Sequence, residues 1–191
     1  MRLKTKFILI VLGLVPMLFS CNSKQKDMAH EQLVRDYFHG FNTGDYNLIS
    51  NSISDSIKIT EKEYVIVHAR NDFHRHFQWD SVFAPKYNII DLKVDGDCAI
   101  GTVSKTCKRI EFLQDSALVS NVSIYFTDNK ISEIQTTEYV FLDYLKWQPR
   151  RDNLTSWIDE NHPELSGFVS DISIKGAQNY LKAIALSKSN E

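Results

Sequence analysis

The sequence is poor in cysteine, glycine and proline: its 191 residues include only 3 Cys, 7 Gly and 4 Pro. Three cysteines are too few and odd in number for a disulfide scaffold, and a chain of this length buries a core without one. The low glycine content excludes a collagen-like or low-complexity chain and leaves no glycine-rich loop to cradle a nucleotide phosphate. With 43% hydrophobic and 24% charged residues, the chain has the composition of an ordinary globular domain.

Basic runs and short catalytic or metal-binding motifs are also missing. The 22 basic side chains are outnumbered by 24 acidic ones, and without a basic patch we expect no nucleic-acid partner. The sequence contains no Ser-His-Asp order, no CxxC pair and no HExxH motif. We therefore predict no metal site and no cofactor.

The N-terminus carries the parts of a secretory signal. Basic residues up to Lys6 precede an apolar run from Phe7 to Phe19, and the small residue Ser20 stands directly before Cys21. This order of basic, apolar and small-residue regions is typical of an exported protein. The apolar run is shorter than the about 20 residues of a membrane-spanning helix. We therefore predict a signal peptide over residues 1–20.

The four residues Leu18-Phe19-Ser20-Cys21 resemble the lipobox of bacterial lipoproteins. The resemblance implies cleavage before Cys21 and lipidation of its thiol, with residues 21–28 as a polar tether. We accordingly expect a protein of the bacterial cell envelope, anchored by its lipid to a membrane, which we take to be the outer membrane. An ordinary signal peptide with a chance cysteine is the alternative. Cleavage would leave 19 of the 22 basic side chains against 24 acidic ones, so the mature chain would be mildly acidic.

Hydrophobic spacing divides the rest of the chain into helices and strands. Apolar residues at helical spacing end at Asn42-Thr43-Gly44-Asp45, whose aspartate is expected to cap a short second helix. The predicted ranges are helices at 30–43, 45–52, 61–83 (or beginning only near Ala69), 152–160 and 173–187, and strands at 57–60, 87–94, 98–113, 117–127 and 131–142. The last four strands alternate apolar and polar residues and form an antiparallel meander. On one such strand Cys98 and Cys107 would be roughly 30 Å apart, so we expect two small buried hydrophobes rather than a disulfide.

The order of these elements resembles the nuclear transport factor 2-like family, which includes SnoaL-like proteins and ketosteroid isomerases. The segment Val34–Asp45 is similar to that family's first helix, with its aromatic pair and Asn-x-Gly-Asp corner, and Tyr125–Ile134 is similar to its last hairpin. The resemblance covers residues 29–142 and implies an α+β, cone-shaped fold, in which a curved antiparallel sheet wraps on helices. Residues 143–191 lie outside it and are predicted to form a C-terminal helical extension.

The inside of such a cone is the expected place for a small-molecule site. The candidates for its lining are Tyr37, Phe41, Tyr64, Phe73, Phe77, Trp79, Tyr125 and Glu138. In an apolar pocket the Glu138 carboxyl would have a raised pKa and could act as a base. Alternatively strand parity turns Glu138 to solvent, and a single bulge reverses that parity. No position matches the catalytic motif of ketosteroid isomerases, so catalytic residues are left unknown.

Two further patterns allow both a structural and a chemical interpretation. His68, Asp72, His76 and Asp80 stand four apart, which places them on one helical face. The set suits a metal ion or an oriented base, but we favour a solvated polar face. The tail tryptophans, Trp147 and Trp157, suit ligand stacking, but we expect them to pack the tail on the outer face of the sheet.

Taken together, these features predict a non-catalytic domain that binds a small apolar or amphipathic ligand or a protein partner. The alternative is an enzyme of isomerase or dehydratase type, which requires at least two titratable groups to converge inside the cone. A protein-interaction module, homodimeric through the open face of the sheet, is the other alternative. It requires an exposed apolar patch on the strands.

Overall fold

The computed structural model describes the backbone of residues 5–189 and the side chains of residues 23–189. The predicted signal peptide, residues 1–20, and the Cys21 thiol therefore lie outside the residues whose side chains are described. The elements in chain order are α1 (Thr5–Thr43), α2 (Tyr46–Ser52), β1 (Ile53–Glu61), β2 (Tyr64–Val67), α3 (Arg70–Ser81), β3 (Lys86–Asp95), β4 (Cys98–Thr106), α4 (Lys108–Gln114), β5 (Leu118–Thr127), β6 (Lys130–Phe141), α5 (Tyr144–Asn161), a 3-10 turn (Pro163–Leu165) and α6 (Ile174–Lys188).

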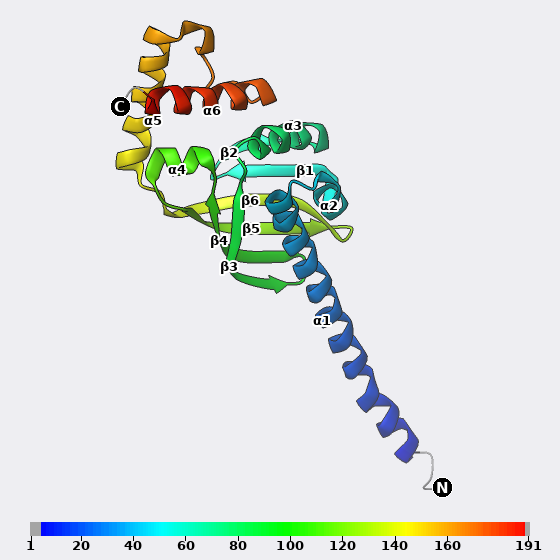
Figure 1. Ribbon diagram of the computed structural model, residues 1–191. Coiled ribbons are helices and arrows are strands. Elements are labelled where there is room, and N and C mark those ends of the chain that lie inside the picture. The colour runs from blue at the N-terminus through cyan, green and yellow to red at the C-terminus, as the bar shows by residue number, and fades with distance from the viewer. Residues whose placement is uncertain (1–4, 190–191) are drawn as a thin grey trace.

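A single curved sheet of six strands forms the centre of the molecule (Figure 1). Its strand order is β2-β1-β6-β5-β4-β3, with β1 parallel to β6 and all other neighbours antiparallel. Register shifts interrupt the β3–β4 and β5–β6 ladders, and such bulges bend strands and increase their twist. The α+β architecture and the four-stranded meander predicted from the sequence are confirmed.

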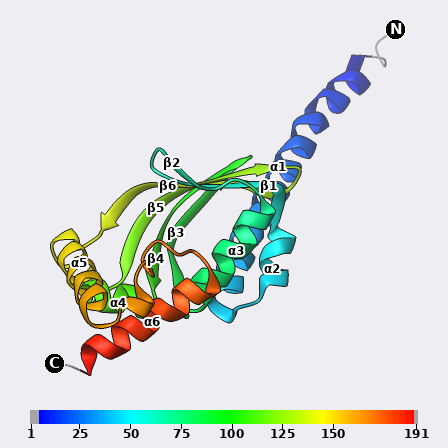
Figure 2. The same ribbon diagram turned by 90° about the horizontal axis from the view of Figure 1, so that it is seen from above.

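The concave face of the sheet packs against α1 and α3 (Figure 2). On α1 the buried residues recur at helical spacing, as Val34, Tyr37, Phe38 and Phe41. The helix ends where the sequence predicts, because Gly44 adopts a left-handed conformation with φ of 73°. The side chain of Asp45 then caps α2 by accepting hydrogen bonds from the amides of its second and third residues, at 2.9 and 3.2 Å.

The long strand predicted over 98–113 is wrong, because β4 ends at Thr106 and α4 begins at Lys108. Cys107 caps this helix: its Sγ accepts a hydrogen bond from the amide of Ile110 at 3.5 Å. Ile110 and Leu113, three residues apart, are both buried on one helical face. Similarly, the helix predicted to start at 61 is preceded by the short strand β2 and begins only at Arg70.

The C-terminal extension covers one end of the sheet and not its outer face. Its helices α5 and α6 pack on α3 and α4 (Figures 1 and 2), where Phe83, Ile110, Ile158, Phe168 and Tyr180 belong to a second buried cluster. The predicted packing of the tail on the outer sheet face is therefore wrong. The reason is α4, whose apolar side gives the tail a partner that a continuous strand would not offer.

Residues 21–28, predicted as a tether, are helical and continue α1. Lys26, Asp27 and His30 of this helix contact the β3–β4 turn. The Lys26 Nζ lies 2.8 Å from a carboxylate oxygen of Asp97, the Asp27 carboxylate accepts from the Gly96 amide at 3.0 Å, and His30 Nδ1 lies 2.8 Å from the Gly96 carbonyl oxygen. Among the described residues, no helix is long and apolar enough to cross a membrane.

Candidate functional site

A cavity of about 610 Å³ lies inside the cone, between the concave sheet face, α1, α3, α4 and the start of α5. Its volume is in the range of small-molecule sites. The apolar part of its wall includes Tyr37, Phe38, Phe41, Val103, Val122 and Ile134, and the polar and charged part includes Glu61, His76, Tyr87, Lys105, Arg109 and Ser120. The protein's own aromatic side chains therefore leave the cone open.

The deepest polar feature beside this cavity is an ion pair between Asp80 and Lys105. Asp80, in the last turn of α3, is completely buried, and both of its carboxylate oxygens lie 2.8 Å from the Lys105 Nζ on β4. Burial alone would raise the pKa of Asp80, but the charge and hydrogen bonds of Lys105 outweigh it and lower that pKa. The two charges therefore neutralise each other inside the cone.

His76 stands one helical turn before Asp80 and lines the cavity. Burial is the main reason that its pKa is lowered, and the positive charges of Lys105 and Arg109 act in the same direction. The negative charge of Asp80 opposes this shift only in part. His76 therefore faces the cavity as a neutral imidazole at neutral pH.

Two buried tyrosines complete the inner polar group. Burial raises the pKa of both Tyr37 and Tyr87 well above the usual range, and the charge of Asp80 raises that of Tyr87 further. The Lys105 Nζ also lies 5.0 Å from the centre of the Tyr87 ring. Both hydroxyls consequently stay protonated. That of Tyr87 hydrogen-bonds to the Asp80 carboxylate, so Tyr37 is the one that can donate to a ligand.

At the outer end of the cavity, Arg109 on α4 is surrounded by aromatic rings. Its guanidinium carbon lies 5.1 Å from the ring centre of Trp79, 5.7 Å from that of Phe83 and 5.5 Å from that of Trp147. Its Nε is buried without a hydrogen-bond partner, as is Nε1 of Trp79. Across the side chains of residues 23–189, no ion pair or hydrogen bond to this guanidinium is found.

Glu61 lies on the opposite wall, at the end of β1, and is partly buried. Burial raises the pKa of its carboxyl, although the neighbouring cations, Arg109 first, lower it in part. Within the described part of the chain, no three His, Cys, Asp or Glu side chains lie close enough together to hold a metal ion.

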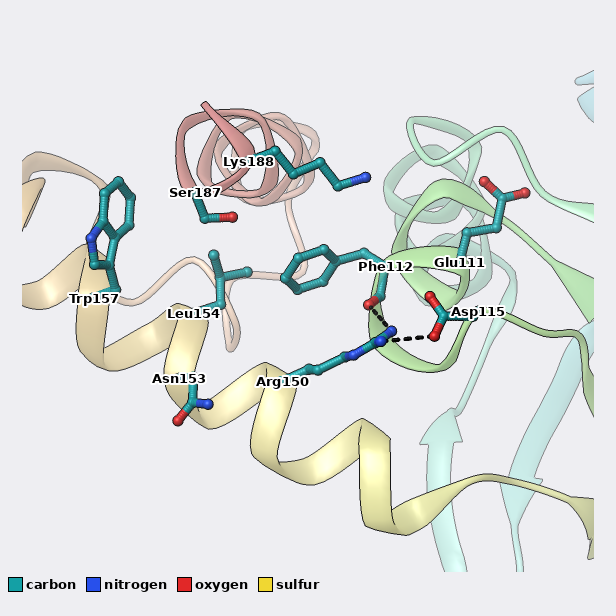
Figure 3. Close-up of a pocket in the computed structure, with 9 residues that line it drawn as sticks. All are labelled: Glu111, Phe112, Asp115, Arg150, Asn153, Leu154, Trp157, Ser187 and Lys188. Carbon is teal, nitrogen blue, oxygen red and sulfur yellow. Dashed lines mark hydrogen bonds and ion pairs between the residues drawn. The ribbon is translucent and has the colours of Figure 1, made fainter. Parts of the chain in front are cut away.

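A second cavity, of about 490 Å³, lies between α4, α5 and α6 (Figure 3). Here Arg150 reaches from α5 to the end of α4, where it lies 2.7 Å from the Asp115 carboxylate and donates to the Phe112 carbonyl oxygen at 3.1 Å. Trp157 and Lys188 stand at its other sides (Figure 3). No buried ionisable cluster like that of the cone adjoins it among the described residues, so the cone is the candidate site.

The structure places only some of the predicted lining residues in the cavity. Tyr37, Phe41 and Trp79 line the cavity, whereas Phe73 and Phe77 are buried in the core between α1 and α3. Tyr64, Tyr125 and Glu138 lie outside it. Tyr64 is 69% exposed on the edge strand β2 and Tyr125 is 38% exposed on the outer sheet face.

Glu138 also points to the outer face, where its carboxylate accepts a hydrogen bond from the Asn121 side chain at 3.1 Å. The register shifts between β5 and β6 explain this direction, because each one changes which face the following residues occupy. The solvent-facing alternative for Glu138 is therefore the one that the structure adopts.

The helical stripe of four polar residues does not form one solvated face, contrary to the favoured interpretation. His68 precedes α3 and is exposed, and Asp72 pairs with Arg75 on the surface. Farther along α3, His76 is partly buried and Asp80 completely buried in the cone, where α6 packs on α3 and Lys105 pairs with Asp80. Lys105 and Arg109 were missed because their segment was predicted as one continuous strand. The helical spacing of Ile110 and Leu113 is the signal that could have shown the change from strand to helix.

Comparisons with known proteins bear on the fold. No protein-family model matches the sequence, and no curated protein matches it. A protein of unknown function with a cystatin-like fold from Methylobium petroleophilum PM1 is similar in structure, with a TM-score of 0.51 and 18% identity over 61% of this chain and 79% of that one. A protein from Kribbella flavida DSM 17836 has a TM-score of 0.50 and 10% identity over 68% and 96% of the two chains.

The chain has the cone-shaped nuclear transport factor 2-like fold. A nuclear transport factor 2-like protein of unknown function from Cytophaga hutchinsonii ATCC 33406 is also similar, with a TM-score of 0.45 and 9% identity over 56% and 86% of the chains. At the identities of the two neighbours with TM-scores of 0.50 and 0.51, the similarity concerns the fold alone.

The lowered pKa of His76 predicts a dependence of stability on pH. The unfolded imidazole has a pKa of about 6.5, and the folded one is lower, so the unfolded state binds the proton first as pH falls. The contribution of neutral His76 to the free energy of unfolding is fully present above the pKa of the unfolded state. It is lost as pH falls from that pKa to the lower pKa of the folded state. We expect urea denaturation between pH 7 and pH 5 to show a steeper loss for the wild type than for His76→Gln.

The control is His39→Gln, because His39 is exposed on α1; its unfolding free energy should follow the wild-type curve. Parallel curves for wild type and His76→Gln would mean that His76 is not held neutral by the fold.

Proposed function

We propose that this protein is a lipid-anchored envelope protein whose cone binds a small amphipathic molecule. The observation that carries this proposal is the open cavity of about 610 Å³, which the protein's own side chains leave unfilled. Apolar walls combined with a few fixed polar groups are the usual composition of a small-molecule site. A domain that served only as a scaffold would fill this volume, because interiors are normally close-packed.

The distribution of charge supports an amphipathic ligand. In the inner part of the cavity, Asp80 and Lys105 neutralise each other and His76 is neutral, so that a neutral part of the ligand fits there. The protonated hydroxyl of Tyr37 offers a donor to an oxygen atom on it. The other charged side chains that line the cavity are Glu61, Lys62 and Arg109.

The course of α1 supports attachment at a membrane. The helix runs without interruption from the segment that contains Cys21 into the domain, and Lys26, five residues after Cys21, pairs with Asp97 of the β3–β4 turn. Five residues of helix span about 8 Å, so an acyl chain on Cys21 would hold the domain close to the lipid surface. The helices α4, α5 and α6 lie at the opposite end (Figures 1 and 2), so the outer end of the cavity would face away from the membrane.

Lipidation is tested by substituting the modified residue. In a bacterial host fed an alkyne-labelled fatty acid, the full chain should become labelled and fractionate with membranes. Cys21→Ser should lose the label and leave the membrane fraction, whereas Cys98→Ser should keep both. A wild-type chain that is exported and cleaved without taking up label would contradict the anchor.

Binding in the cone is tested with N-phenyl-1-naphthylamine, a neutral apolar fluorophore. Ser120 is buried on the inner side of β5 and lines the cavity, so the ring of Ser120→Phe should fill the space and weaken binding at least about tenfold. Ser123→Phe is the matched control, because Ser123 pairs with the exposed Ile100 on the outer face of the sheet. Equal affinity of both variants and the wild type would place the fluorophore elsewhere.

An enzyme of acid–base type is the second candidate, favoured because His76 and Tyr37 line the same cavity. The neutral imidazole is able to take a proton from a carbon next to a carbonyl group, while Tyr37 donates a hydrogen bond to the carbonyl oxygen. Such an enzyme should exchange the α-hydrogens of a small cyclic ketone in D₂O faster than buffer, as followed by NMR, and His76→Gln should abolish the excess rate. Exchange at the buffer rate would reject this candidate.

A protein partner on the outer sheet face has less support. That face exposes Ile100 and Tyr125, but polar side chains such as Asn121, Glu133 and Glu138 surround them. Single exposed apolar residues are common on soluble proteins. A homodimer through this face therefore stays a proposal of lower rank than the cone ligand.

A further inference from the structure

We infer that the ligand of the cone carries a single carboxylate, which Arg109 recognises at the outer end of the cavity. This inference rests on the proposed function and specifies its ligand class. It also assigns a role to the C-terminal extension, because Trp147, one of the three rings around Arg109, comes from α5.

Arg109 has no anionic partner among the side chains of residues 23–189. Of the acidic groups near the cavity, Asp80 is engaged with both oxygens by Lys105, and no ion pair joins Glu61 to Arg109 within residues 23–189. Burial raises the pKa of Glu61 by more than the positive charge of Arg109 lowers it. The two side chains therefore do not behave as a close ion pair. A partly buried guanidinium without a carboxylate is an unusual and costly arrangement.

The three aromatic rings around Arg109 leave its hydrogen-bond donors without acceptors. Trp79, Phe83 and Trp147 stabilise the positive charge through their π-electrons. They do not supply conventional acceptors for the five N–H donors of the guanidinium, which lie in its plane. A carboxylate matches that plane with two parallel hydrogen bonds. The rings thus orient a donor group whose matching acceptor is absent from the described part of the chain.

The charges around the cavity favour a ligand with a single negative charge. Lys105 is neutralised by Asp80, which leaves Arg109 as the partly buried cation of the cavity wall without a counter-ion among the described residues; Lys62, which also lines the cavity, is exposed to solvent. The carboxyl of Glu61 lines the same cavity and would disfavour a doubly charged group such as a phosphate monoester. One carboxylate on an otherwise neutral ligand therefore fits the charge of the site.

The structural alternative is that Arg109 only joins α3, α4 and α5 by stacking. Two matched probes separate the alternatives: 6-phenylhexanoate and 6-phenylhexan-1-ol share their apolar part and differ in the charged group. Calorimetric titration of the full chain should show the acid binding at least about tenfold more tightly than the alcohol. Arg109→Gln should lower the affinity for the acid to that for the alcohol and leave the affinity for the alcohol unchanged. The affinity of Arg109→Lys for the acid should lie between those of the wild type and Arg109→Gln.

The control variant is Lys108→Gln, because Lys108 is the exposed neighbour of Arg109 on α4 and does not line the cavity. It should keep the wild-type preference. If Arg109→Gln does not fold, the wild type still decides the matter by NMR: the Arg109 Nε–H resonance should shift with the acid and stay in place with the alcohol.

The outcomes distinguish this inference from the proposed function. Binding of both probes with equal affinity, or an equal loss of both in Arg109→Gln, would overturn the carboxylate inference and leave a neutral cone ligand standing. Failure of both probes to bind the wild type would overturn the inference together with the proposed binding of amphipathic molecules.

Discussion

The buried ion pair between Asp80 and Lys105 is the interaction on which the candidate site depends. It joins the last turn of α3 to β4 at the wall of the cone, with both carboxylate oxygens 2.8 Å from the ammonium nitrogen. Neither partner is tolerable there without the other, because an isolated charge in this position would remain desolvated and uncompensated. The pair also influences its surroundings: the Asp80 charge adds to the effect of burial in raising the pKa of Tyr87, and Lys105 adds to the effect of burial in lowering the pKa of His76.

The C-terminal extension completes what the sheet and the first three helices leave open. Its helices bury the apolar sides of α3 and α4, and the start of α5 brings Trp147 to the outer end of the cavity. The extension therefore belongs to the site as well as to the core. This arrangement places the guanidinium of Arg109 between the common fold and the added helices, so both parts of the chain line the candidate site.

Local sequence signals predicted much of the fold, whereas long-range packing decided the site. The Asp45 cap, the first helix and the meander followed from capping chemistry and periodicity within short windows. The seven-residue helix α4 was missed because its apolar positions also suit a strand. Glu138 was ambiguous because bulges in a neighbouring ladder set its face. Asp80 is buried and His76 partly buried on a helix that α6, about 100 residues later in the chain, packs against, and a helical pattern cannot reveal this.

The most direct test of the central claim is a crystal structure of the full chain with bound 6-phenylhexanoate. The account predicts the phenyl ring against the apolar wall near Phe41 and Val122, the carboxylate paired with the Arg109 guanidinium, and the Asp80–Lys105 pair unchanged. A ligand bound instead between α4, α5 and α6, or a cone that closes and excludes it, would contradict the account.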